Sequence, residues 1–472
     1  MTPEGPALCK ADPSNPRSRG CKYSGQHFST AVEAERAYAK MMGGELPTSG
    51  KKSVGRSGHF RGESALLMDL ELTPDEGTQI AIGRLAQAGL TPLVVGGAVR
   101  DGILGEHPKD FDIEVHGAAN FQQLSRALGK DAKLNLTGKS FGVLKAQFRQ
   151  ADGSWSADVD LALPRRDSKV GDGHRGFEVE VDPTMSLEEA TARRDLTVNA
   201  LFWDPQTRQV VDLHGGLEDM DRRRLRHVSD AFSEDPLRVL RVARFSAKLG
   251  FSVAEETNEL SQRLAPTFHD LSSERVRGEL SRMVIQRHFT EGYKFLESSG
   301  WHRELGDLSR LSMEELTEKL RRADSYSRSV QSSPDRVAHL AVLARAVEKT
   351  GGNASSTVAH FVASSREQQK AVALAKAELP TSHSSAALRQ WAFDQGKLSG
   401  RAILLSRGEE DRAELEALRG KLEALDILDG PEPDGFDSRS LIANYRSSHP
   451  GIKDGPWIRE LLQKARSKQY AR

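Results

Sequence analysis

The spacing of apolar residues changes partway along the chain, from short strands mixed with helices to helices alone. After Thr73, apolar residues at helical spacing lead into the run Pro92–Val95, which predicts a helix followed by a short buried strand. Strand-like runs follow at 111–115 and 143–148, and a fourth covers 155–163. Strands mixed with helices in this first part of the chain predict an α/β or α+β head.

The fourth run alternates most clearly between apolar and polar positions. One face would carry Val159, Leu161 and Leu163, and the other Asp158, Asp160 and Ala162. This pattern is typical of a strand that buries one face.

From about Asp230 onward the pattern is helical, with few strand signals. The breaks expected inside this part are Gly351-Gly352 and Gly430-Pro431. The predicted fold class is α+β, an N-terminal mixed α/β head followed by an all-α neck, body and tail. The expected segments are an extension at 1–72, the head at 73–228, the neck at 229–290, and the body and tail at 291–472.

Composition narrows the class of protein. A chain of 472 residues is too long for one compact core. No stretch reaches the roughly 18–20 consecutive apolar residues that cross a bilayer, and the N-terminus has no secretory pattern, so we expect a cytoplasmic protein without a membrane partner. Cys9 and Cys21 are the only cysteines and form no zinc or disulfide pattern.

Charge is distributed unevenly along a chain that is neutral overall. Residues 1–62 contain ten Lys and Arg against five Asp and Glu, a net charge of +5, and the last twenty residues are also basic. Such segments either contact phosphates locally or form solvated tails. The extension at 1–72 is rich in Gly, Ser and Pro and is expected to be disordered, apart from a possible helix at 29–42.

A glycine pair and two aspartates form the most informative constellation. Gly96-Gly97 follows the first strand and precedes a helix, where glycine lets the backbone approach an anion such as a triphosphate. Asp110 and Asp112 alternate on the next strand, so both carboxylates are expected on one side. Asp160 on the later strand offers a third carboxylate.

Adjacent carboxylates repel each other, and a divalent cation relieves that repulsion. Mg²⁺ prefers a few carboxylates together with substrate phosphates, so we predict that Asp110 and Asp112 hold Mg²⁺ and that Asp160 assists. A lone D-x-D is more often a solvated strand end, and Gly-Gly before a helix is most often a tight turn. The order and spacing of the two together favour the catalytic interpretation.

Several segments in order resemble class II tRNA nucleotidyltransferases and bacterial poly(A) polymerases, within the DNA polymerase β superfamily. The first segment has the G-G-x-V-R-D and D-x-D motifs. The segments lie within residues 90–285 and are Gly96–Asp112, Val159–Arg165, Arg193–Ala200, Asp212–Arg226, Ser233–Arg241 and Leu271–Leu280. The resemblance implies nucleotide binding by Gly96, Gly97, Arg100, Arg194, Asp195, Asn199, Glu234, Asp235, Arg238 and Arg241.

The segment around Asp235 and Arg238 is expected to select the base. The two residues are three apart, and on a helix they would be neighbours on one face. Asp accepts from an exocyclic amine and Arg donates to a ring acceptor. Such a pair would accept cytosine and adenine but leave unpaired groups against guanine and uracil, at about 1–3 kcal/mol each. Without the other motifs, an ordinary surface helix with ion pairs would be the better interpretation.

The sequence therefore predicts a template-independent nucleotidyltransferase that adds C and A from CTP and ATP to the 3′ end of tRNA. Two rivals of the same class share every motif, a poly(A) polymerase and a partial enzyme that adds only CC or only A. A rival of another class is a non-catalytic RNA-binding protein with the same fold. The sequence does not indicate an oligomeric state.

Two glycine-containing segments mimic phosphate-binding motifs but are predicted to be loops or turns. Gly171–Gly176 fits G-x-G-x-x-G but does not join a strand to a helix, so a mobile loop near the nucleotide is expected from the resemblance. Gly138-Lys139-Ser140 lacks the first glycine of a P-loop, because position 133 is Lys133, and we expect a turn.

Overall fold

The computed structural model describes residues 21–23, 26–28, 65–135, 143–169, 177–311, 318–322, 325–326, 336–395, 398–407, 411–429, 438–453 and 455–470. Four predictions fall on residues outside these ranges: the helix at 29–42, the turn at Gly138-Lys139-Ser140, the loop at Gly171–Gly176 and the break at Gly430-Pro431. The chain forms two compact units. The head unit comprises Met1–Arg238 and Phe251–Leu260, and the helical unit comprises Val239–Gly250 and Ser261–Arg472.

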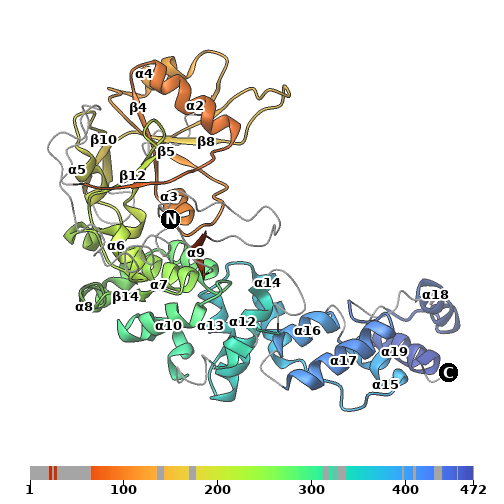
Figure 1. Ribbon diagram of the computed structural model, residues 1–472. Helices are drawn as coiled ribbons and strands as arrows, with labels where there is room; N and C mark the ends of the chain where they lie inside the picture. Colours follow the sequence, from red (N-terminus) through yellow and green to blue (C-terminus); the bar gives the residue numbers. More distant parts are fainter. Residues whose placement is uncertain are drawn as a thin grey trace. The chain divides into compact units, whose positions relative to one another are not determined.

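The head unit is built on an eight-stranded mixed sheet (Figure 1). Only β5 and β8 pair in parallel within it; the other neighbours are antiparallel. In spatial order the strands are β3 (Leu66–Asp69), β12 (Gln209–Asp212), β11 (Phe202–Asp204), β4 (Thr91–Val95), β5 (Asp112–His116), β8 (Val159–Ala162), β7 (Val143–Gln147) and β6 (Lys133–Asn135).

One face of the sheet packs against two neighbouring helices, α2 (Glu76–Gln87) and α4 (Phe121–Leu128), as Figure 1 shows. Both helices begin at a capping side chain: Asp75 accepts from the amide of Thr78, and Asn120 from that of Gln123. The core beneath them includes Leu85, Leu124, Ile113, Val115, Leu144, Ala146, Val159, Leu161 and Leu163. The predicted alternation of the fourth run is thus confirmed.

The other face of the sheet carries both a small apolar core and a polar cluster. The core joins Leu93, Val95, Phe202 and Val211 to Leu187 of α5 (Leu187–Ala192). Since side chains alternate along a strand, the residues between the apolar positions of β5, β7 and β8 point to this face. These residues are Asp112, Glu114, His116, Lys145 and Asp160.

Several element bounds differ from the predictions. β5 starts at Asp112, so Asp110 precedes the strand instead of lying on it. The fourth run is a strand only over Val159–Ala162, and Trp155 contributes an isolated bridge to Arg149. β3 lies inside the segment 1–72, which was expected to be disordered. The strand was not predicted because its partner β12 is about 140 residues away, where a local pattern does not reveal it.

Shorter elements complete the head unit. They are β1 (Cys21–Tyr23), β2 (Gln26–Phe28), α3 (Gly97–Ile103), β9 (Arg165–Lys169), β10 (Phe177–Val181), η3 (Thr197–Asn199), α6 (Gly216–Asp221), β13 (Arg224–Leu225), η4 (Asp230–Glu234) and β14 (Ser252–Val253). β14 returns from beyond Gly250 to pair in parallel with β13.

Helices alone form the described part of the second unit, which confirms the all-α prediction there. Helices α7 (Leu237–Leu249) and α8 (Glu255–Leu264) contribute residues to both units. The others are η5 (Ala265–Asp270), α9 (Ser273–Met283), α10 (Phe289–Ser298), η6 (Trp301–Glu304), η7 (Gly306–Arg310), α12 (Arg336–Lys349), α13 (Ala354–Ala359), α14 (Ser365–Lys376), α15 (Ser385–Asp394), α16 (Gly400–Ser406), α17 (Arg412–Ala424), α18 (Ser438–Ser448) and α19 (Trp457–Tyr470).

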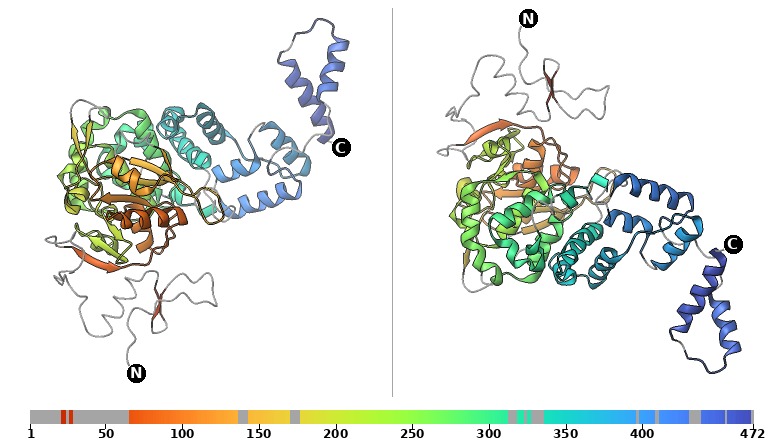
Figure 2. Two further views of the ribbon diagram at one scale, coloured as in Figure 1. Left: turned by 90° about the horizontal axis from the view of Figure 1, so that it is seen from above. Right: turned by 90° about the horizontal axis from the view of Figure 1, so that it is seen from below.

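Local sequence accounts for where many of these helices begin and end. Ser272, Asn353, Ser364, Ser384, Ser399 and Asp411 each cap a helix by accepting from a backbone amide of its first turn. The predicted break at Gly351-Gly352 separates α12 from α13, with Gly351 at a φ of 75°. Helices α18 and α19 form a hairpin at the C-terminal end of the unit (Figure 2). Within the described ranges, every helix is too short or too polar to span a bilayer.

Candidate active site

The candidate site lies where β4 ends and β5 begins. These strands are antiparallel, and Val95, the last residue of β4, is directly opposite Asp112, the first of β5. The glycine pair that follows β4 is therefore at the same edge of the sheet as the aspartate. Gly96 has a φ of 70°, a value that residues with a Cβ rarely adopt, and this explains the glycine.

Three carboxylates share this region. Asp112 is exposed at the start of β5, Asp160 lies half-buried on the adjacent strand β8, and Asp110 is exposed two residues before β5. Desolvation by the surrounding protein is the main cause that raises the pKa of Asp112, and the negative charges of Asp160 and Asp110 add to it. The positive charges of Arg194 and Lys145 oppose the shift. The Lys145 ammonium lies 2.8 Å from Asp160 Oδ1.

The carboxylates fit a divalent cation. Desolvation is the main cause of the raised pKa of Asp112, and the nearby charges of Asp160 and Asp110 add to it; a cation would relieve that repulsion between carboxylates. Among the described residues, no group of three or more His, Cys, Asp or Glu side chains is arranged closely enough to hold a metal alone. Ligation of a cation by Asp110 and Asp112 remains a prediction.

Three of the residues predicted to bind nucleotide are buried and bonded to one another. Arg100 Nη1 donates to Asn199 Oδ1 at 2.5 Å, and Asn199 Nδ2 donates to Asp195 Oδ1 at 3.0 Å. Arg100 also donates twice to Asp101. Since all three are at most 7% exposed, they form a rigid base under the glycine turn.

Arg194 is held by a residue that sequence reasoning did not select. Its Nη2 lies 3.1 Å from Glu114 Oε2, and the other carboxylate oxygen lies 2.9 Å from His116 Nε2. Burial alone would raise the pKa of Glu114, but the His116 hydrogen bond and the Arg194 charge outweigh it and hold the pKa below its usual value. Asp112, Glu114 and His116 alternate on β5, a spacing that could have indicated the contact between Glu114 and His116 but not the one with Arg194.

The predicted base-reading segment differs from the single helix face expected. Helix α7 begins only at Leu237, so Asp235 and Pro236 precede it, and Asp235 Oδ1 accepts from the Leu237 amide at 3.2 Å. Asp235 has an extended backbone that a helix interior would not allow. Its carbonyl still accepts from the Arg238 amide, so the two residues remain adjacent.

The guanidinium of Arg238 contacts two backbone carbonyls of the head unit. It donates to Ala231 at 2.5 Å and to Arg193 at 2.6 Å, which joins η4 to the residue before Arg194. Glu234 is exposed at the end of η4. Arg241 belongs to the helical unit, where its guanidinium lies 5.7 Å from the ring centroid of Phe245.

A second buried carboxylate supports the nucleotide-binding residues from behind. Asp219 is fully buried and accepts from Thr197 Oγ1 at 2.7 Å, from Arg224 at 2.6 and 2.9 Å, and from Arg226 Nε at 2.8 Å. Thr197 begins η3, the turn that presents Asn199. This link between distant segments was also missed in the sequence.

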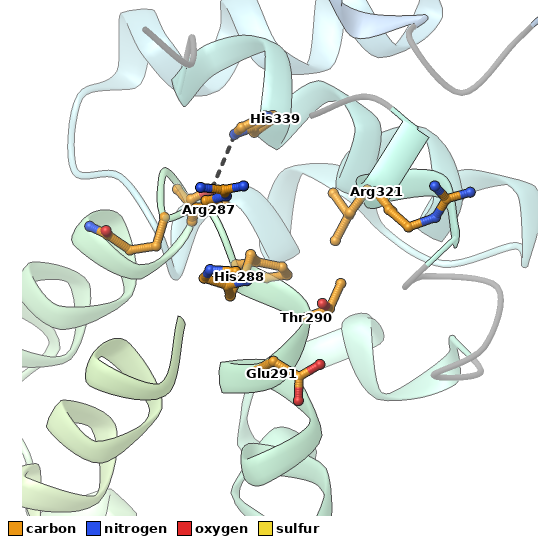
Figure 3. Close-up of a pocket in the computed structure, with 10 residues that line it drawn as sticks. Arg287, His288, Thr290, Glu291, Arg321 and His339 are labelled. Carbon is orange, nitrogen blue, oxygen red and sulfur yellow. Dashed lines mark hydrogen bonds between the residues drawn. The ribbon is translucent and has the colours of Figure 1, made fainter. Parts of the chain in front are cut away.

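The helical unit contains a separate pocket of about 260 Å³, drawn in Figure 3. Arg287, His288, His339 and Arg321 line it together with Glu291. The Arg321 guanidinium pairs with Glu318 and points away from His339 in Figure 3. The positive groups do not converge on one point, so the pocket defines no ligand.

The mixed sheet, the glycine turn and the carboxylates at its edge fit the nucleotidyltransferase head that the sequence predicts. Residues 93–226 match the family of the poly A polymerase head domain, and residues 250–305 match a probable RNA and SrmB-binding site of polymerase A. The "Multifunctional CCA protein" of Pasteurella multocida is 41% identical over 213 residues, 44% of this chain and 47% of the relative. That of Xylella fastidiosa strain 9a5c is 40% identical over 43% of this chain and 46% of the relative.

Solved structures with the same fold extend over more of the chain. The CCA-adding enzyme of Bacillus stearothermophilus in complex with CTP aligns with a TM-score of 0.61 at 22% identity, over 83% of this chain and 91% of that one. The Thermotoga maritima CCA-adding enzyme complexed with tRNA aligns with a TM-score of 0.53 at 17% identity, over 86% and 95%. At these identities the likeness concerns the fold.

Over residues 93–226 and 250–305, the chain is therefore similar to the head and RNA-binding families of poly(A) polymerases, and the relatives that it resembles there are named for CCA. It spans about half the length of the curated relatives that it matches.

Proposed function

We propose that the protein adds C and A nucleotides to the 3′ end of tRNA, using CTP and ATP and releasing pyrophosphate. The observation that carries the proposal is the group of carboxylates at the edge of the sheet, beside Gly96 and the Arg194 guanidinium. The choice of tRNA and of C and A draws on the relatives, which are named for CCA.

In the proposed reaction, the terminal 3′ oxygen of the RNA attacks the α-phosphorus of the nucleotide. The bond from that phosphorus to the bridging oxygen of the β-phosphate breaks, and the hydroxyl proton passes to solvent. Asp110 and Asp112 would hold Mg²⁺, with Asp160 assisting. A bound Mg²⁺ supplies charge neutralisation at the reacting phosphate and lowers the pKa of the attacking hydroxyl.

The other head residues would act by positioning the nucleotide. Arg194 would contact its phosphates, because the guanidinium lies beside the Gly96 turn. Arg100, Asn199 and Asp195 would fix the shape of the turn through their mutual hydrogen bonds. The acceleration is then expected from orientation and electrostatics, without a protein nucleophile.

Base selection would depend on Asp235 and Arg238, supported by Glu234 and Arg241. Two donors of Arg238 already hold backbone carbonyls, so base reading requires other donors of that guanidinium or a rearrangement when the nucleotide enters. We therefore propose that Arg238 also fixes the backbone at Arg193, next to the phosphate-binding Arg194.

A direct assay tests the reaction. The protein is incubated with tRNA lacking its last three nucleotides, and with CTP and ATP separately and together. We expect C addition with CTP alone and termination after CCA with both. Failure to incorporate either nucleotide under every condition would favour a non-catalytic RNA-binding protein.

The substitution Asp112→Ala tests the metal assignment. It removes one of two proposed cation ligands from an exposed position, so we expect incorporation to fall by at least about a thousandfold while the unfolding free energy stays within about 1 kcal/mol of wild type. Incorporation rate and urea unfolding are the measurements. A variant with near-normal activity would refute the assignment.

Poly(A) polymerase activity is the second candidate, because the matching head family is described by that activity. It predicts continued A addition to tRNA that already ends in CCA. A partial enzyme would instead stop after CC, or add A only to tRNA ending in CC. Product length in the same assay separates these outcomes.

A further inference from the structure

Glu114 lies on the same face of the sheet as Asp112, two residues further along β5. The Glu114 side chain is 2% exposed, whereas Asp112 at the strand start is open to solvent. Burial of a carboxylate is costly unless it has partners. A carboxylate buried at this position therefore points to a role that requires its negative charge.

Both oxygens of Glu114 are engaged. Oε2 lies 3.1 Å from Arg194 Nη2, and Oε1 lies 2.9 Å from His116 Nε2. His116 is itself fixed edge to face against Phe202, with ring centroids 6.1 Å apart. The carboxylate is thus clamped in the sheet and gives Arg194 a fixed anchor.

Three further contacts determine where the Arg194 guanidinium lies. Nη1 donates to the Asn199 carbonyl at 3.3 Å, and the guanidinium lies 5.7 Å from the centroid of the Phe202 ring. A Cβ at Gly96 would lie only 3.5 Å from Nη1. The guanidinium therefore sits directly against the glycine turn.

The Arg194 charge is also close enough to Asp112 to oppose the rise in the pKa of that carboxyl. An arginine side chain is long and flexible, and without Glu114 it would be free to pair with the aspartates at the sheet edge. Such a pair would compete with both a nucleotide phosphate and a cation.

We propose that Glu114 is a positioning residue that holds Arg194 against the Gly96 turn, oriented toward the nucleotide phosphates and away from Asp112. This inference rests on the proposed function, because it assigns Arg194 to a nucleoside triphosphate. Glu114 itself would contact neither the nucleotide nor a cation.

A double-mutant cycle on the full chain tests the proposal. The Kd values for CTP and ATP are measured by calorimetry, with Mg²⁺ and without tRNA, so that no turnover occurs. Glu114→Gln keeps the size of the side chain but removes its charge, and we expect both Kd values to rise about tenfold, as for a lost charge-assisted hydrogen bond. Arg194→Ala is expected to weaken binding at least as much.

The double variant is the decisive measurement. If Glu114 acts through Arg194, then Glu114→Gln should add less than about twofold to the Kd of Arg194→Ala. Fully additive effects, or an unchanged Kd in Glu114→Gln, would overturn the inference. A purely structural role would lower the unfolding free energy without this coupling.

Two further variants keep the result interpretable. Asp131→Asn breaks another carboxylate–arginine pair of the head unit, with Arg84, and should leave both Kd values unchanged. Glu114→Asp keeps the charge but shortens the side chain, and it replaces Glu114→Gln if that variant does not fold. We expect its Kd to lie between those of wild type and Arg194→Ala. An unchanged Kd would overturn the inference. Failure of the wild-type protein to bind either nucleotide would instead refute the proposed function.

Discussion

Charged side chains of the head unit are partnered across long stretches of sequence. Glu114 bonds Arg194, 80 residues away, and Arg238 reaches the Arg193 carbonyl, 45 residues away. In a weakly polar interior, an interaction of this kind fixes geometry, because a buried charge cannot easily exchange its partner for water. The site is therefore held by groups that do not react.

Asp219→Asn is expected to destabilise the head unit by about 2–4 kcal/mol, since two arginines then lack their full counter-charge at a buried position. Urea unfolding, followed by tryptophan fluorescence and circular dichroism, measures the loss. Asp131→Asn is the control, because Asp131 is exposed and solvent screens its pair with Arg84, so a much smaller loss is expected. Equal effects of the two variants would contradict the importance of burial.

His360 makes the helical unit sensitive to acid. Burial, and then the Arg277 charge, lower the pKa of this half-buried histidine. The unfolded chain takes up a proton at the ordinary pKa of about 6.5, whereas the folded unit resists it. Stability contributed by neutral His360 is thus present above about pH 6.5 and is lost as pH falls below that value.

We expect the unfolding free energy of the helical unit to decline between about pH 7 and pH 5, and to decline less in His360→Gln. Urea titrations at several pH values measure the slope. His383 is exposed, so His383→Gln offers a comparison in which the slope should not change. An identical slope in wild type and His360→Gln would exclude the buried histidine as its cause.

At the scale of elements, the predictable strands are those whose own residues form a local pattern. The runs that became β7 and β8 alternate, whereas β4 was predicted from a short continuous apolar run. The expected same-side pair of Asp110 and Asp112 was wrong in part, because Asp110 precedes β5. The pairing of β3 with β12 was not predictable, because it is made between segments without a local signal for it. The pairing of Glu114 with Arg194 was missed for a similar reason, since Arg194 is 80 residues away in the sequence.

The helix expected after Thr73 begins at Glu76, whereas the expected single helix face of Asp235 and Arg238 was wrong. Asp235 was expected on the face of α7, yet it caps the amide of Leu237 from outside the helix. Pro236 explains the difference, because a proline disfavours the helical conformation in the residue before it.

At the scale of the whole molecule, the head unit is not one continuous segment. The chain leaves it after Arg238 and returns for Phe251–Leu260. The returning residues supply β14, the parallel partner of β13, and Thr257, whose hydroxyl accepts from the His227 amide at 3.0 Å. The Arg223 guanidinium lies over the Phe251 ring, with its central carbon 5.2 Å from the ring centroid.

A head fragment that ends at Leu264 is therefore expected to be more stable than one that ends at Arg238, by at least about 2 kcal/mol, from the lost burial of Phe251 and the unpaired β13. Both fragments would start at Ala65. Urea unfolding compares them, and limited proteolysis should cut the shorter fragment faster. Equal stability would mean that residues 251–260 contribute little to the head.

The edge strand β3 also has a consequence for synthesis on the ribosome. Residues are made from the N-terminus, so Leu66–Asp69 is available long before β12 at Gln209–Asp212 exists. During that interval β3 has unpaired backbone groups and carries Leu66, which is 44% exposed even in the finished fold. The nascent chain therefore passes through a stage in which a chaperone that binds extended apolar segments has a target, and this target disappears when the sheet closes.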